Sequence, residues 1–393
     1  MSNFSLASVG AWLAVALAAY FVRGRPYAMF VSIIVGVYTF SATSFAPIVA
    51  DTLVWPAFAT LHVSVYVHLL LLARPRMRPL WYRVFVSIPA SFFVAGAVLS
   101  LPWGILIRLG FHPWVPWLPF AVALTGVWHS MTARKSNVHI VLDELNIPTM
   151  ARHRSSKEHT DRPLKIVQIT DPHLGPFMSV ARLRKICERA VLAGPDLIVL
   201  TGDFLTMESQ DRADHLRDAL APLLPMAGRT FACHGNHDHE APRVVAEALS
   251  SNGIHLLIDE QAVARTPYGD VEVLGFDFVF ANRKEHAARL AAKYPRTGLM
   301  RIALLHDPGA FKHLPEGTAD LVLSGHTHGG HLGFVSLGGT WTVPRIVDMP
   351  DHGLWARNRD RLYVHRGTGH YGFPLRLGVP AEESVLHVHS KRS

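Results

Sequence analysis

Side chains that suit divalent metals occur in five short motifs, arranged in order along the C-terminal two thirds of the chain. Carboxylate and amide oxygens together with imidazole nitrogens are ligands for hard or borderline ions such as Mn²⁺, Fe and Zn²⁺. Two of the motifs place such residues two positions apart, so an extended loop would turn both side chains the same way. The pattern predicts a metal centre assembled from several loops. The motifs are Asp171-Pro172-His173, Gly202-Asp203, Gly235-Asn236-His237-Asp238, Leu305-His306-Asp307 and Gly325-His326-Thr327-His328.

The elements that would position these motifs are short apolar strands that alternate with helices. Strands are expected over residues 164–170, 196–201, 230–233, 270–276, 301–305 and 319–323. Helices are expected over residues 180–192, 211–224, 241–250 and 284–293. Alternation of this kind is typical of an α/β layered domain, in which ligands gather beyond the carboxyl ends of the strands. Each candidate ligand follows directly after one of these strands, as that rule requires.

The five motifs resemble those of the calcineurin-like metallophosphoesterases, whose pattern reads D-x-H, G-D-x-x, G-N-H-[DE], H, G-H-x-H. The resemblance covers about residues 137–393. It implies a four-layer α/β sandwich with two divalent metal ions that activate a bridging water, the nucleophile, for attack on phosphorus. Asp203 would bridge the two ions. The implied ligands are Asp171, His173, Asp203 and His328 for one ion and Asp203, Asn236, His306 and His326 for the other.

The same resemblance suggests roles for residues outside the ligand set. His237 would protonate the leaving oxygen or stabilise the charge on the phosphoryl group, and Asp238 would orient it by hydrogen bonding or charge. His331 is a candidate for substrate contact, because similar proteins often carry a polar amide at this position. In the tail, Arg366 or Arg376 is a candidate for holding a phosphate oxygen, and an ordinary surface ion pair is the equal alternative for either.

The first third of the chain has a different composition. Residues 1–22, 26–50, 52–73, 84–107 and 109–133 contain no Asp, Glu, Lys or Arg. Each window is long enough to cross a hydrocarbon core of about 30 Å as a helix of about 20 residues. We therefore expect about five transmembrane helices in a domain over residues 1–135. Residues 136–163 would form a linker with a first strand and a polar loop, and residues 164–393 would form the catalytic domain.

Basic residues in the short loops predict the orientation in the membrane. They lie after the first, third and fifth windows, whereas the opposite loops hold only Asp51 and Arg108. Positively charged loops stay in the cytoplasm, which places the N-terminus outside and the catalytic domain in the cytoplasm of a multi-pass inner (cell) membrane protein. The two cysteines offer no disulfide framework, as expected in a reducing compartment. The basic loop residues are Arg23, Arg25, Arg74, Arg76, Arg78, Arg83, Arg134 and Lys135.

The net charge of +8 is confined to the membrane part. Residues 1–135 carry nine Lys or Arg and one acidic residue, and the remaining 258 residues carry 29 of each sign. The basic balance therefore reflects topology and gives no reason to expect nucleic acid as a partner.

Two classes of function fit these features. The first is a membrane-bound phosphoesterase that hydrolyses a phosphodiester, phosphomonoester or pyrophosphate bond. An active site beside the bilayer favours an amphipathic lipid phosphate, with the loop 276–280 and Phe373 as candidates for holding acyl chains; cyclic nucleotides or phosphoproteins are the alternative if the helices only tether. The second class is a non-catalytic sensor or transporter that binds metal or phosphate. The full ligand set and His237 favour the enzyme. The layout also resembles the animal proteins called transmembrane protein with metallophosphoesterase domain.

Overall fold

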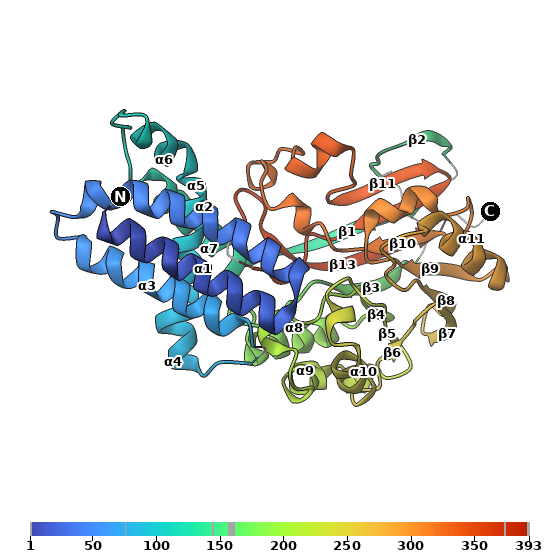
Figure 1. Ribbon diagram of the computed structural model, residues 1–393. Helices are drawn as coiled ribbons and strands as arrows, with labels where there is room; N and C mark the ends of the chain where they lie inside the picture. Colours follow the sequence, from blue (N-terminus) through green and yellow to red (C-terminus); the bar gives the residue numbers. More distant parts are fainter. Residues whose placement is uncertain (1, 75, 144, 156–161, 373–374, 391–393) are drawn as a thin grey trace. The chain divides into compact units, whose positions relative to one another are not determined.

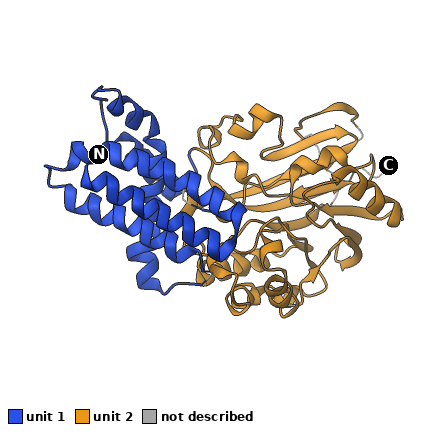
Figure 2. Cartoon of the chain, in the orientation of Figure 1, with its two compact units in different colours: residues 1–128, 372–377 blue, residues 129–371, 378–393 orange. Residues whose placement is uncertain are grey.

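The computed structural model describes residues 2–74, 76–143, 145–155, 162–372 and 375–390. The chain forms two compact units (Figure 2). The helical unit comprises residues 1–128 and 372–377, and the sheet unit comprises residues 129–371 and 378–393. Part of the expected polar loop, residues 156–161, lies outside the described residues.

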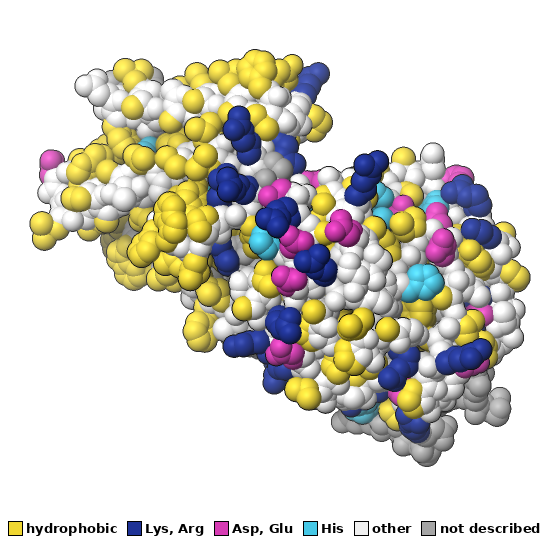
Figure 3. All heavy atoms as spheres, turned by 90° about the horizontal axis from the view of Figure 1, so that it is seen from below, with side chains coloured by type: hydrophobic (Ala, Val, Ile, Leu, Met, Phe, Trp, Pro, Cys, Tyr) yellow, Lys and Arg dark blue, Asp and Glu magenta, His cyan; other side chains and the backbone are white. Residues whose placement is uncertain are grey.

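The helical unit contains four helical segments that are long and apolar enough to cross a membrane. They are α1 (Asn3–Arg23), α2 (Arg25–Val49), α3 (Trp55–Leu72), and the continuous run of α4 (Leu80–Tyr82), a π-helical turn (Arg83–Ser87) and α5 (Ile88–Leu99). Phe21, Phe30 and Ile33 are more than half exposed, which suits contact with lipid. Figure 3 shows hydrophobic side chains gathered over this unit on the face in view.

The structure has four candidate spans among the described residues, one fewer than the five expected. Residues 109–117, at the start of the fifth window, form turns and irregular chain and include Gly110, Pro113 and Pro116. Before them, α5 ends at Leu99 and the short α6 (Leu101–Arg108) begins with Pro102, which has no amide hydrogen to continue the helix. The last helix, α7 (Leu118–Met131), has 14 residues, about 21 Å at 1.5 Å per residue. The absence of charged residues shows that a stretch is apolar, but it does not show that the stretch forms one continuous helix.

The sheet unit is built on two sheets, whose strand orders and bounds are as follows. The six-stranded sheet runs β1 (Ala133–Leu142), β13 (Ala381–Ser390), β3 (Leu164–Ile169), β4 (Leu197–Leu200), β5 (Thr230–Ala232) and β6 (His255–Leu256). The seven-stranded sheet runs β2 (Ile147–Arg152), β11 (Gly353–Asn358), β12 (Asp360–Val364), β10 (Leu321–Ser324), β9 (Met300–Leu304), β8 (Gly269–Gly275) and β7 (Glu260–Thr266).

The two sheets face each other across one apolar core. Alternate residues of β3, β4 and β5 meet alternate residues of β8, β9 and β10 in this core, including Ile166, Val199 and Phe231 from the first sheet and Val273 and Ile302 from the second. The outer faces are covered by helices (Figure 1): α8 (Val180–Leu192), α9 (Asp214–Leu220) and α10 (Pro242–Ser250) beside the first sheet, and α11 (Arg283–Lys293) on the second. The expected four-layer α/β sandwich is therefore confirmed.

Candidate functional site

All five motifs lie just beyond the carboxyl ends of strands. Asp171 and His173 follow β3, Asp203 follows β4, and Asn236 follows β5 in the first sheet. In the second sheet, one motif follows β9 and another follows β10. Because these neighbouring strands run parallel within each sheet, their carboxyl ends lie at a common edge, and the facing sheets bring the two edges together.

Six of the seven expected ligands form two groups of converging side-chain atoms. The first group is Asp171, His173 and His328, and the second is Asp203, His306 and His326. His173 Nε2 lies 3.1 Å from His328 Nε2, and His306 Nε2 lies 3.2 Å from His326 Nδ1. Ligands bound at about 2.0–2.2 Å to one tetrahedral ion would be separated by about 3.3–3.5 Å. The spacing in both groups suits a bound divalent ion.

Asp203 connects the two groups. Its Oδ2 atom lies 3.3 Å from His306 Nε2 and 3.6 Å from His173 Nε2. The seventh expected ligand, Asn236, has a buried Oδ1 atom without a hydrogen-bond partner among the described residues. A buried amide oxygen left without a partner is costly, and a cation in the second group would satisfy it. The donor set thus fits two divalent ions that share Asp203.

The backbone at these ligands is strained. Asp171, His173, Asp203, His326 and His328 all have positive φ, between 46° and 67°. Residues other than glycine rarely adopt this left-handed region, and such residues cluster at functional sites. The strain persists because the surrounding loops pack tightly: a Cβ atom on Gly202 would lie 2.3 Å from the backbone nitrogen of Gly235.

Hydrogen bonds around the ligands orient their metal-facing atoms. The His306 Nδ1 atom lies 2.6 Å from the carbonyl oxygen of Thr201. A carbonyl only accepts, so Nδ1 carries the proton and donates it, and Nε2 is free to face Asp203. The Thr170 hydroxyl donates to Asp171 Oδ2 at 2.7 Å. These contacts hold each ligand in the orientation that a metal requires.

The charges in the cluster call for a cation. Burial raises the pKa of Asp171 to about 6 and lowers the pKa of His173 to about 3. Burial also lowers the pKa of His326 to about 4, and the charge of His306 adds to this effect. Burial opposes the charged form of His306, yet the neighbouring Asp203 carboxylate raises its pKa to about 10. The proton on His306 therefore supplies positive charge that a divalent ion would replace.

His237 lies beside the two groups, as expected, but its neighbours differ from the expectation. Its Nδ1 atom lies 2.8 Å from Glu240 Oε1, and its ring stacks on Tyr371 with 4.1 Å between the ring centres. Burial opposes its charged form, but Glu240 and Asp203 raise its pKa overall. The backbone N–H of His237 donates to Asp203 Oδ1 at 2.9 Å, which anchors the residue to the metal ligands.

Asp238 was expected to orient His237 by hydrogen bonding or charge; its charge helps to raise the pKa of His237, but its hydrogen bonds go elsewhere. Its carboxylate accepts from the backbone N–H groups of Asp203 at 2.7 Å, Phe204 at 2.9 Å and Gly235 at 2.7 Å. Asp238 thus joins the loop after β4 to the loop after β5, and His237 Nδ1 donates its hydrogen bond to Glu240 instead. Sequence reasoning missed Glu240, although its place three residues after His237 in a helical turn was visible.

The two residues predicted to contact substrate lie in different surroundings. The His331 ring lies 5.0 Å from the His328 ring, next to the first group. Arg366 is buried, and its Nε atom lies 3.3 Å from Glu382 Oε2. The ion-pair alternative for Arg366 is therefore present, but it lies inside the unit and not on the surface. Arg376, the other candidate for a phosphate contact, is fully buried.

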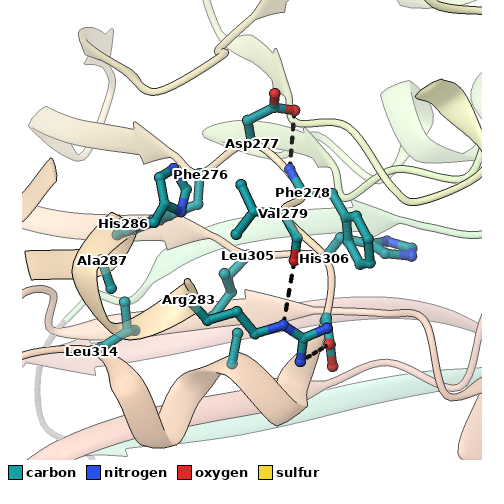
Figure 4. A pocket seen from close by; sticks show the side chains of 12 residues that line it. Phe276, Asp277, Phe278, Val279, Arg283, His286, Ala287, Leu305, His306 and Leu314 are labelled. Carbon is teal, nitrogen blue, oxygen red and sulfur yellow. Dashed lines mark hydrogen bonds and ion pairs between the residues drawn. The ribbon is translucent and has the colours of Figure 1, made fainter. Parts of the chain in front are cut away.

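A small pocket of about 20 Å³ lies beside the second group of ligands (Figure 4). It is lined by His306 and by part of the 276–280 loop, including Phe278 and Val279. Arg283 on α11 also lines the pocket, where it pairs with Asp307 at 2.7 Å. Phe280 is 76% exposed, and Phe373, the other candidate for contact with acyl chains, lies outside the described residues.

Comparisons with known proteins agree with the motifs. The family model described as calcineurin-like phosphoesterase matches residues 164–330. The chain is 32% identical to phosphodiesterase YaeI of Escherichia coli (strain K12) over 231 residues, 58% of this chain and 82% of that protein. It is 28% identical to the uncharacterized metallophosphoesterase YkuE of Bacillus subtilis (strain 168), covering 58% of this chain and 79% of YkuE.

The name of another relative combines a transmembrane part with a metallophosphoesterase domain, as expected for this chain. The transmembrane protein with metallophosphoesterase domain from Danio rerio is 30% identical over 237 residues. The match covers 56% of this chain and 52% of that protein.

Proposed function

Because the chain belongs to the calcineurin-like phosphoesterase family, we propose that it is a membrane-bound hydrolase that uses two divalent metal ions on a phosphodiester, phosphomonoester or pyrophosphate bond. One observation carries the proposal. Two groups of ligand atoms meet at Asp203, while His237 lies beside them and belongs to neither. A site that only stored metal would have no chemical need for that extra imidazole.

The ligand types favour particular metals. Asp171, His173, Asp203 and His328 would hold one ion, and Asp203, Asn236, His306 and His326 the other. Four imidazoles suit Mn²⁺, Fe or Zn²⁺ better than Mg²⁺. When bound, the ions would supply Lewis-acid activation of water and of the phosphoryl oxygens.

The chain's own residues would do the remaining work. His237, whose pKa is raised by Glu240, would give a proton to the leaving oxygen from its other ring nitrogen. The Tyr371 ring stacked on His237 limits its rotation and excludes water from one face. Asp238 holds the loops of Asp203 and Asn236 in register through three backbone hydrogen bonds.

The test is turnover by the purified full-length protein in detergent, with bis-p-nitrophenyl phosphate and Mn²⁺. We expect hydrolysis that is lost on chelation and restored by Mn²⁺, and lost in the Asp203→Asn variant. Stoichiometric metal binding without any turnover, on this substrate or on phosphomonoesters and pyrophosphates, would instead support a non-catalytic sensor or transporter.

We further propose an amphipathic phosphate as substrate. The segment 332–347 directly follows His331 and carries seven exposed large hydrophobic residues. Soluble domains rarely expose so many together, and such surfaces mark contact with protein, membrane or ligand. The residues are Leu332, Phe334, Leu337, Trp341, Val343, Ile346 and Val347.

The comparison that decides the substrate class is between lipid phosphates and cyclic nucleotides, both offered to the full-length protein. We expect a higher kcat/KM on the lipid phosphate, and a selective loss of that activity in the double variant Leu337→Ser/Ile346→Ser. Higher kcat/KM on cyclic nucleotides than on any lipid phosphate would show that the helices only tether the enzyme.

We also propose that the N-terminus lies outside the cell membrane and the sheet unit in the cytoplasm. The basic loops support this orientation. Four crossings would return the chain to the side on which it started, so the proposal requires residues 101–131 to cross once more. This short stretch would have to combine α6, the turns at 109–117 and α7.

Cysteine labelling tests the orientation with little background, because Cys187 and Cys233 are both buried. Thr52 and Arg212 are exposed, the first between α2 and α3 and the second before α9. With a membrane-impermeant maleimide on intact cells, Thr52→Cys should react and Arg212→Cys should react only after lysis. Labelling of Arg212→Cys in intact cells would place the sheet unit outside.

A further inference from the structure

A third group of potential metal ligands lies outside the two groups already described. It consists of His234, His239 and Asp277, whose ligand atoms all lie within 4.8 Å of one another. His234 follows β5, His239 lies in the helical turn Asp238–Glu240, and Asp277 follows β8. The sequence contains no motif that joins these residues, since about 40 positions separate Asp277 from the two histidines.

The geometry of the group is that of a coordination shell. The Asp277 Oδ1 atom lies 3.0 Å from His234 Nδ1 and 3.3 Å from His239 Nε2. These separations are close to the distance of about 3.3–3.5 Å between ligands of one tetrahedral ion. The two histidines come from the loop between β5 and α10 and Asp277 from the loop after β8, so the group joins two loops that are distant in sequence.

Hydrogen bonding alone does not explain this convergence. The backbone N–H of Phe278 also donates to Asp277 Oδ1, at 3.0 Å. Three nitrogen atoms therefore crowd one carboxylate oxygen, which has about two lone pairs to offer. A cation between the two imidazoles and the carboxylate would remove the competition, because each nitrogen would then direct its lone pair at the ion.

The group is also open to solvent on one side. The His239 and Asp277 side chains are 32% and 21% exposed, whereas the His234 side chain is only 5% exposed. An ion held here would have three protein ligands and one free coordination position, the arrangement of zinc sites that bind an exchangeable ligand. Asp277 also lines the pocket that contains His306 (Figure 4).

We propose that His234, His239 and Asp277 bind a third divalent ion of the zinc type, separate from the two ions that share Asp203. Two imidazoles and one carboxylate favour Zn²⁺ over Mg²⁺ or Ca²⁺. The free coordination position would take an anionic oxygen, such as one of a phosphate. The ion site itself does not depend on the proposed hydrolytic function.

The test counts metal ions in the full-length protein after removal of metal, reconstitution with Zn²⁺ and desalting. Elemental analysis should give three ions per chain for the natural sequence and two for His239→Ala. His239 is exposed, so this variant leaves the buried core intact. His255→Ala, which removes another exposed histidine, on β6, is the matched control and should keep three ions.

Two further variants assign the lost ion to this group. Asp277→Asn should also bind two ions, and the Asp203→Asn variant should keep the third ion while losing one or both of the others. Substitution with Co²⁺ gives a second readout, because visible absorption from the third site should disappear in His239→Ala and in Asp277→Asn and persist in His255→Ala. Two ions in the natural protein, or three in both His239→Ala and Asp277→Asn, would overturn the proposal.

Discussion

Both units bury histidines, and the comparison between His62 of the helical unit and His173 of the sheet unit shows how a structural histidine differs from a ligand. His62 Nε2 lies 2.9 Å from the Ser8 hydroxyl, and His62 Nδ1 lies 2.7 Å from the Tyr38 hydroxyl. Hydroxyls can donate or accept, so both ring nitrogens are satisfied within the protein. His173 Nε2 instead faces another imidazole, His328, and the carboxylate of Asp203.

The difference lies in what each nitrogen meets and not in burial, since His62 is 4% exposed and His173 is 1% exposed. The His173 Nδ1 atom lies 3.4 Å from the carbonyl oxygen of Leu205, which only accepts, so a neutral His173 keeps its proton on Nδ1 and a lone pair on Nε2. Burial lowers the pKa of His173 and disfavours protonation of that Nε2 atom. A divalent ion would satisfy the His173 nitrogen, whereas both nitrogens of His62 already have hydrogen-bond partners.

The largest expected effect comes from the residue that joins the two ligand groups. Asp203→Asn should lose both ions or the second ion, together with turnover, because one amide oxygen cannot replace a bridging carboxylate. Elemental analysis alongside an activity assay measures both losses. Full metal occupancy with normal activity would rule out the bridging role.

His237→Ala should slow turnover of substrates with poor leaving groups by about 10²–10⁴, the usual range for general acid–base catalysis. The loss should be smaller for p-nitrophenyl esters, whose leaving group needs little protonation. Rates on matched alkyl and p-nitrophenyl phosphates measure the difference, with Glu240→Gln expected to show a weaker form of the same pattern. Equal losses on both substrates would mean that His237 stabilises phosphoryl charge.

The Arg366–Glu382 pair predicts a pH dependence of stability that is independent of metal. Burial opposes ionisation of Glu382, but Arg366 lowers its pKa to about 2. A carboxyl group whose pKa is depressed on folding stabilises the protein above its unfolded pKa of about 4.3 and loses that contribution as the pH falls towards 2. Thermal unfolding of the apoprotein should therefore weaken over this range, and Glu382→Gln should flatten the dependence. An unchanged pH profile in Glu382→Gln would return Arg366 to the candidates for phosphate binding.

The smallest effect is expected in the helical unit. His62→Phe leaves the buried Tyr38 hydroxyl without its partner and should lower the free energy of unfolding by about 1–3 kcal/mol. Metal content and kcat should not change, whereas the matched variant His173→Phe should lose metal. Thermal unfolding in detergent and elemental analysis measure the pair. Loss of metal in His62→Phe would contradict the distinction between His62 as a structural histidine and His173 as a metal ligand.

The elements that carry the ligands were predicted closely from sequence. The strand expected over residues 164–170 is β3 (Leu164–Ile169), and the helix expected over residues 180–192 is α8 (Val180–Leu192). Short apolar runs between turn residues predict buried strands well, because both faces of such a strand lie against other layers. The edge strand β7 (Glu260–Thr266) was missed, since four of its seven residues are polar.

Residue types and their order along the chain determined the family and the four-layer fold, because metal chemistry and strand burial each demand particular side chains at short spacing. Three features were decided only by the tertiary structure. Glu240 and not Asp238 hydrogen-bonds His237, Arg366 turns inward to Glu382, and Asp277 meets His234 and His239. Each depends on which loops approach one another across the sheets, and no local spacing encodes that approach. Whether a membrane helix is continuous was also decided only by the tertiary structure. Residues 109–133 contain no charged side chain, yet the turns at residues 109–117 interrupt the helix.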